Sequence, residues 1–167
     1  MSGDPIPIFV MSYNDLGSLR LCLRAIARRT YRPYRLIVVD NASSDERLSR
    51  YLDKLTALTA VRVYRNRFNL WILGLNQALR EQTGPHSENG FFAVSDCDIV
   101  VPGPRDGQCW LGRMEASMVA HACIGKLGLS LDLGYIARRP SFEQTLHQER
   151  FFLEGARIGD LVIAPVD

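Results

Sequence analysis

The sequence lacks the usual marks of a zinc-bound, disulfide-bonded or membrane-spanning protein. Its four cysteines show no C-x-x-C spacing and no accompanying histidine pattern, which argues against a zinc site and a disulfide framework. The N-terminus has no basic stretch followed by an apolar one. No apolar run approaches the roughly 20 residues that a helix needs to cross a bilayer. We therefore expect a cytoplasmic protein.

Several common signatures of nucleotide chemistry and metal catalysis are also missing. There is no G-x-x-x-x-G-K-[ST] phosphate loop and no G-x-G-x-x-G opening a helix after the first apolar run. These absences disfavour a P-loop nucleotidase and a dinucleotide-binding dehydrogenase. No H-E-x-x-H is present, and we interpret the scattered His86, His121 and His147 as surface or partly packed residues. Nothing indicates a nucleic-acid partner.

The composition is that of one soluble globular domain. The chain has 167 residues, of which 47% are apolar and 23% charged, which is ordinary for such a domain. There is no internal repeat and no low-complexity stretch. Arg20, Arg24 and Arg28 recur at helical spacing. They form either a solvated helix face or a basic stripe that attracts anionic lipid or a phosphorylated ligand, with peripheral contact at the inner face of the membrane.

Apolar runs typical of strands alternate with helical periodicity along the chain. This alternation predicts right-handed βαβ units, hence an α/β fold with a mostly parallel central sheet flanked by helices. The expected strands are residues 6–11, 36–39, 61–64, 91–94, 123–133 and 161–164. The expected helices are residues 16–26, 48–55 with Ser44 as N-cap, 71–79 and 110–118.

Polar clusters follow three of the expected strands. They are residues 12–15, 40–41 and 96–98. Because ligands of parallel α/β sheets bind beyond the carboxyl ends of the strands, we expect these clusters to form one site. Asp40 then contacts a base or ribose, or alternatively caps the turn that follows it.

Asp96 and Asp98 form an Asp-x-Asp pair at the end of an apolar run. In an extended segment, residues two apart point to the same side, so the two carboxylates would project together. Two like charges held close together favour a cation between them, and carboxylate oxygens suit Mg²⁺ or Mn²⁺ completed by phosphate oxygens. The sequence therefore predicts a divalent metal cofactor here. The alternative is a solvated turn.

Four blocks of the chain resemble, in order and spacing, the family 2 glycosyltransferases of GT-A fold. They are residues 7–14, residues 37–45, Asn69-Leu70 with Gly74 and Asn76, and residues 95–98. The resemblance covers residues 6–104 approximately. It implies a Rossmann-like GT-A nucleotide-diphospho-sugar transferase fold. It also implies metal-dependent, inverting transfer of a sugar from a UDP-type nucleotide-sugar donor to a hydroxyl of a saccharide, lipid or protein acceptor.

The resemblance also implies roles for individual residues. Asp98 is the direct metal ligand and Asp96 lies near the metal, ribose and donor sugar. The family has glycine where Trp71 stands, so this ring either narrows the donor pocket or packs in the core. Asn69 and Asn76 flank a helix start and could instead cap it or face solvent. The expected nucleotide-sugar-binding residues are Ser12, Tyr13, Asn14, Asp40, Asn41, Asn69, Asn76 and Asp96.

The catalytic base is not assigned, because in the family it lies in a later region. Residues 1–104 would be the nucleotide-sugar-binding half of a single domain, and 105–167 the start of an incomplete acceptor-side half. Asp132 follows an apolar run and either reaches the site from a strand or is a surface carboxylate. The candidate bases are Asp132, Glu143, Glu149, Glu154 and Asp167.

Three other functions compete with glycosyl transfer. A truncated or vestigial module would bind a nucleotide sugar without transferring it, and the short C-terminal region favours that alternative. A receiver-type phosphoacceptor domain would need an acidic pair after the first strand, where Ser12-Tyr13-Asn14 stands. A nucleotidyltransferase would show a glycine- and basic-rich loop there, and none is present.

Overall fold

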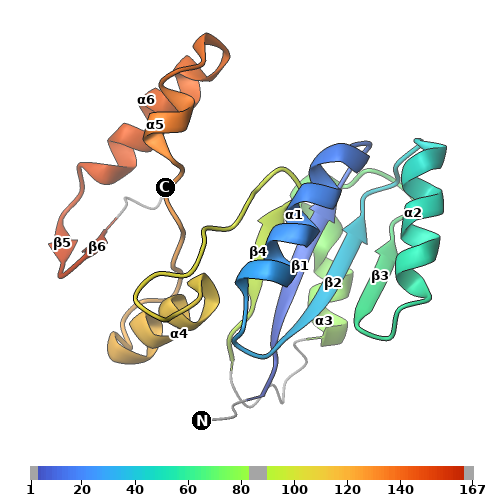
Figure 1. Cartoon of the computed structure of the whole chain (residues 1–167), viewed down its shortest axis with the longest axis horizontal. Helices are drawn as coiled ribbons and strands as arrows, with labels where there is room; N and C mark the ends of the chain where they lie inside the picture. Colours follow the sequence, from blue (N-terminus) through green and yellow to red (C-terminus); the bar gives the residue numbers. More distant parts are fainter. Residues whose placement is uncertain (1–3, 83–89, 164–167) are drawn as a thin grey trace. The chain divides into compact units, whose positions relative to one another are not determined.

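A four-stranded parallel sheet organises the N-terminal part of the chain (Figure 1). The computed structural model describes residues 4–82 and 90–163, and the chain divides into two compact units, Met1–Cys123 and Ile124–Asp167. In the first unit the strand order is β3-β2-β1-β4, with all neighbours parallel. The strands are β1 (Ile6–Ser12), β2 (Tyr34–Asp40), β3 (Val61–Arg65) and β4 (Ala93–Asp96). The α/β fold expected from the sequence is confirmed.

Helices cover both faces of this sheet. One face packs against α1 and α2, and its buried cluster includes the start of α4. The other face packs against η1 and α3. The helices are α1 (Leu16–Arg29), α2 (Glu46–Thr56), the 3₁₀ helix η1 (Trp71–Leu75), α3 (Asn76–Gln82) and α4 (Trp110–Ala120). None of the described helices is long and apolar enough to span a membrane.

The burial of each strand follows from its place in the sheet. The central strands β1 and β2 are covered on both faces, so both carry continuous runs of buried apolar residues. The edge strand β4 alternates between half-buried and exposed residues. In the register, Ser12 lies opposite Asp40 and Met11 opposite Asp96. The last residues of β1, β2 and β4 therefore share one edge of the sheet.

The second unit is built from short elements. Its helices are α5 (Leu133–Ile136), the 3₁₀ turn η2 (Pro140–Phe142) and α6 (Glu143–Leu153). An antiparallel hairpin follows, made of β5 (Arg157–Ile158) and β6 (Leu161–Val162).

Several expectations about the elements differ from the structure. Residues 123–133 form no strand, because Gly125 and Gly128 interrupt the alternating side chains that a strand needs. Helix α2 is capped by Asp45 rather than Ser44, since the Asp45 carboxylate accepts from the Arg47 amide at 2.8 Å. The helix expected over 71–79 is divided into η1 and α3. The fourth strand is also shifted to Ala93–Asp96 and so includes the first aspartate of the acidic pair.

Candidate functional site

Three of the predicted site residues meet at the carboxyl edge of the sheet. Ser12, Asp40 and Asp96 are the last residues of β1, β2 and β4, which are neighbours in the sheet. Ser12 and Asp40 are directly paired, and Asp96 lies opposite the residue before Ser12. The chain thus places a hydroxyl and two carboxylates where parallel α/β sheets hold their ligands.

Ser12 and Asp40 are the buried members of this group. Ser12 is 1% exposed, and its Oγ lies beside the Cys97 thiol but makes no hydrogen bond of regular geometry among the described residues. A buried hydroxyl left unpaired is costly, so its position suits a group supplied by a ligand. Asp40 is 6% exposed, and its Oδ1 accepts from the Ser43 amide at 3.3 Å. One of the two carboxylate oxygens of Asp40 therefore caps the turn that follows β2, as the alternative interpretation of this residue expected.

Asp96 and Asp98 lie close together, though not as two residues of one strand. The pairing of β4 with β1 ends at Asp96, and Cys97 and Asp98 form a turn, so the expected extended geometry of the pair is wrong. Burial, together with the negative charge of Asp98, raises the pKa of Asp96. The mutual repulsion that a cation would relieve is therefore present at these two carboxylates.

A divalent cation fits this pair when a bound ligand supplies the rest of its coordination. Among the described residues, no group of three or more histidine, cysteine, aspartate or glutamate side chains is placed to hold a metal. Two carboxylates completed by phosphate oxygens and water match the coordination that Mg²⁺ prefers. The donor set therefore suits a metal that arrives with a diphosphate.

The cysteine between the two aspartates is not suited to binding a soft metal. Cys97 is buried, and burial raises the pKa of its thiol. Burial likewise raises the pKa of the neighbouring Cys22 to about 12. Because thiolates rather than thiols bind metals and act as nucleophiles, both cysteines are inert packing residues at neutral pH.

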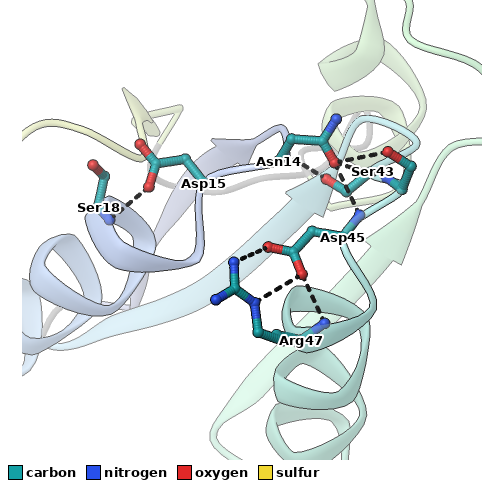
Figure 2. Close-up of polar contacts among 7 residues, drawn as sticks. Asn14, Asp15, Ser18, Ser43, Asp45 and Arg47 are labelled. Carbon is teal, nitrogen blue, oxygen red and sulfur yellow. Dashed lines mark hydrogen bonds and ion pairs between the residues drawn. The ribbon is translucent and has the colours of Figure 1, made fainter.

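Asn14 fastens the loop after β1 to the loop after β2 (Figure 2). Its Oδ1 accepts from the Ser44 and Asp45 amides at 2.7 and 3.1 Å, and its own amide donates to Ser43 Oγ at 2.9 Å. Asn14 has a φ of 51°, in the left-handed region that asparagine tolerates. The Asn14 side chain thus fixes the shape of this edge, beside the exposed ring of Tyr13.

Two further acidic residues at this edge are helix caps. Asp15 Oδ1 accepts from the Ser18 amide at 2.9 Å, and this bond is the main reason that the pKa of Asp15 is lowered (Figure 2). The pKa of Asp45 is lowered chiefly by its bond to the Arg47 side chain. Carboxylates held in the charged form in this way are poor candidates for a catalytic base.

Asn41 is the centre of a buried amide network. Its Nδ2 donates to Asn69 Oδ1 at 2.8 Å and to the Trp71 carbonyl at 3.1 Å. Its Oδ1 accepts from the Leu70 amide at 3.0 Å and from Asn66 Nδ2 at 3.1 Å. The side chain is 2% exposed. Asn41 therefore ties the end of β2 to residues 66–71.

Gly74 allows this network to form. A Cβ built on Gly74 would lie 2.5 Å from Asn41 Oδ1 and 2.8 Å from Asn66 Nδ2, closer than side chains tolerate. The sequence patterns missed Asn66, although it follows β3 directly, as Asn41 follows β2. The position of Asn66 directly after a strand was the signal that could have identified it as a site residue.

Trp71 does not pack in the core. Its side chain is 79% exposed, and its φ of 52° is in the left-handed region, which explains why glycine suits this position. The core-packing alternative is therefore wrong. Asn76 begins α3, is exposed, and helps line a hollow of about 580 Å³. The other residues lining the hollow are Asn66, Leu70, Leu73, Gly74, Gln77, Arg80 and Glu81.

The candidate bases lie in the second unit. Asp132 caps α5 by accepting from the Tyr135 amide at 3.0 Å, so the expectation that it reaches a site from a strand is wrong. Glu149 accepts from the Leu131 amide at 3.2 Å. Glu143 and Glu154 stand at the two ends of α6. Asp167 lies outside the described residues.

The sheet order and the covering helices define an α/β fold, and carboxylates stand at the ends of two of its strands. The model of the Glycosyl transferase family 2 matches residues 8–125, and the chain therefore belongs to family 2 of the glycosyltransferases. No curated protein matches the chain.

A similar solved structure supports the GT-A fold. The crystal structure of TarS from S. aureus matches with a TM-score of 0.53 and 18% sequence identity. The match covers 77% of this chain and 24% of that chain, so the protein spans about a quarter of the length of TarS. At this identity the similarity concerns the fold alone.

Proposed function

We propose that the protein is a metal-dependent, inverting glycosyltransferase that moves a sugar from a nucleotide-sugar donor to an acceptor hydroxyl. The observation that carries this proposal is the meeting of Ser12, Asp40 and the Asp96–Asp98 pair at one edge of a family 2 sheet. Donor and acceptor are the partners that membership of this family suggests.

The buried end of the site is suited to a nucleoside. The unpaired Ser12 hydroxyl can donate or accept, and Asp40 has a second carboxylate oxygen for a base N–H or a ribose hydroxyl. The ring of Tyr13 is 49% exposed beside them and offers an aromatic face to a base. These three residues bind and orient the donor.

Asp96 and Asp98 are the residues that would hold Mn²⁺ or Mg²⁺. When bound, the cation supplies positive charge that offsets the negative charge of the departing diphosphate. Because the metal and the diphosphate complete each other's coordination, cation and donor are expected to bind together.

Asn14, Asn41 and Asn69 contribute indirectly. The carbonyl oxygens of Asn14 and Asn69 and the whole amide of Asn41 are engaged within the protein. We infer that these three residues set the positions of the loops around the donor, and that Ser12, Tyr13 and Asp40 make the direct contacts.

The alternative function is donor binding without transfer. It is favoured by the local hydrogen bonds that engage two of the candidate bases, Asp132 and Glu149. A turnover assay separates the two functions: release of nucleoside diphosphate from a panel of nucleotide sugars with Mn²⁺, with and without saccharide, lipid or peptide acceptors.

Two charge-matched variants sharpen this assay. Asp98→Asn removes one charge from the acidic pair, and Glu46→Gln removes one from an exposed ion pair on α2. We expect turnover in wild type and Glu46→Gln, and a loss of at least tenfold in Asp98→Asn. Binding without turnover across the panel would favour the vestigial module. Equal turnover in all three proteins would refute the assigned role of Asp98.

A further inference from the structure

Residues 68–73, here called the apolar segment, expose large hydrophobic side chains in sequence. Phe68 is 73% exposed and Trp71 is 79% exposed, and Leu70, Ile72 and Leu73 are exposed as well. Single exposed apolar residues are common on protein surfaces, but a contiguous group marks a surface that meets a partner.

Several backbone groups of this segment are paired within the protein. The amides of Leu70 and Trp71 donate to Asn41 Oδ1 and Asn69 Oδ1, both at 3.0 Å. The Trp71 carbonyl accepts from Asn41, and the Leu73 amide donates to the Leu70 carbonyl. Entry into an apolar medium is costly mainly for unpaired backbone groups. This segment could therefore leave water without breaking these bonds.

Trp71 is held outward at a conformational cost. A left-handed φ is unfavourable for a bulky residue, and such strain persists where the surrounding structure fixes it and is frequent at functional positions. The amide network around Asn41 supplies that fixation. The exposed ring is therefore presented on a fixed loop.

Positive charge borders the apolar segment. Arg67 precedes Phe68 directly, and Arg80 lines the hollow together with Leu70 and Leu73. Neither arginine has an ion-pair partner within the part of the chain that the structure describes. Glu81 also lines the hollow, and its carboxylate accepts from Gln77 at 3.0 Å.

We propose that the apolar segment docks the protein onto an anionic lipid bilayer. Trp71 and its aliphatic neighbours enter the interface, and Arg67 and Arg80 contact lipid phosphates. A saccharide could also stack on Trp71, but Leu70, Ile72 and Leu73 offer nothing to sugar hydroxyls and favour hydrocarbon. The inference goes beyond the proposed function and does not depend on it.

Tryptophan fluorescence gives a direct readout. The chain has two tryptophans, and the second, Trp110, is buried, so a blue shift on adding vesicles reports on Trp71. The probe is vesicles of phosphatidylcholine alone or with an equal part of phosphatidylglycerol, combined with co-sedimentation. We expect a blue shift and sedimentation with the anionic vesicles, both weakened by salt.

Three variants locate the contact. Trp71→Gly/Ile72→Ser should reduce partitioning at least tenfold and should fold, because glycine relieves the left-handed backbone. Arg67→Gln/Arg80→Gln should reduce partitioning several-fold on anionic vesicles only. Leu58→Ser/Val119→Ser removes exposed apolar side chains elsewhere and should partition as wild type does.

Four outcomes would overturn the proposal. They are the absence of partitioning, equal partitioning of the Trp71→Gly/Ile72→Ser variant and wild type, a blue shift with soluble saccharides but not with vesicles, and self-association that buries Trp71. A further variant, Arg20→Gln/Arg24→Gln/Arg28→Gln, tests the basic face of α1. If it alone abolished sedimentation, the contact would lie on that helix.

Discussion

Replacing Asn41 by aspartate tests whether its buried amide holds the end of β2 and residues 66–71 together. The change keeps the size of the side chain and replaces Nδ2 by an oxygen. That oxygen would face Asn69 Oδ1 and the Trp71 carbonyl, which lie 2.8 and 3.1 Å from Nδ2. Two hydrogen bonds become two oxygen–oxygen contacts, and a charge is placed at a position that is 2% exposed.

The expected cost follows from these contacts. Each lost hydrogen bond costs about 1 kcal/mol, and the unpaired buried charge adds several more. The hydrogen bonds from the Leu70 amide and Asn66 Nδ2 to Oδ1 of residue 41 persist and offset part of this cost. We expect Asn41→Asp to lower the free energy of unfolding by about 3–5 kcal/mol at neutral pH, a large share of a typical ~5–15 kcal/mol.

The pH dependence has a defined sign. Burial raises the pKa of the introduced carboxyl in the folded state above its unfolded value of about 4. The charge penalty is therefore absent below that unfolded value, grows as the pH rises, and becomes constant above the folded value. A protonated carboxyl also restores one donor. The loss of stability should be smaller near pH 4 than at pH 7.

The assay is urea unfolding followed by the fluorescence of Trp110. Trp110 is 6% exposed and donates to Thr30 Oγ1 at 2.8 Å, so its emission reports on the first unit. A Trp71→Phe background leaves it as the single tryptophan. Asn69→Asp is the matched control, because Oδ1 is the only Asn69 side-chain atom with hydrogen bonds among the described residues. The network's role would be refuted if Asn41→Asp lowered the free energy of unfolding by less than about 1 kcal/mol, or if both variants lowered it equally.

The same unfolding assay checks three more predictions. Gly74→Ala should cost about 2–4 kcal/mol, because its Cβ would displace Asn41. Trp71→Gly should instead stabilise the protein by about 0.5–1 kcal/mol through relief of its left-handed backbone. Glu115→Gln should cost about 1–2 kcal/mol, because Arg32 donates to both Glu115 oxygens at 2.6 and 2.7 Å. Since these bonds lower the pKa of Glu115, that cost should disappear as the pH falls below about 4.5 and through the folded value.

The centre of the fold could be predicted from the sequence because its strands are buried on both faces. The runs at residues 6–11 and 36–39 are uninterrupted by charged or polar residues and contain several β-branched ones, and β1 and β2 contain both runs. The polar residues that follow these two runs predicted that the strand ends meet at one edge of the sheet. The edge strand β4 gives a weaker signal, since its alternate residues face solvent, and its limits were shifted by two residues.

The side-chain networks at that edge could not be predicted. Asn41 meets Asn69 and Leu70, which are 28 and 29 residues away, and Asn14 meets Ser44, 30 residues away. Such contacts depend on how the loops close, which no local pattern encodes. For the same reason, the hydrogen bonds of Asn14, Asn41 and Asn69 to neighbouring loops could not be predicted.

Calorimetric titration with a nucleoside diphosphate, with and without Mn²⁺, tests whether Asp96 and Asp98 hold a metal together with the diphosphate. We expect binding in wild type that Mn²⁺ strengthens at least tenfold, and the loss of this metal-dependent gain in Asp98→Ala. Metal-dependent binding of equal strength in wild type and Asp98→Ala would contradict the assignment of the acidic pair as the metal and diphosphate site.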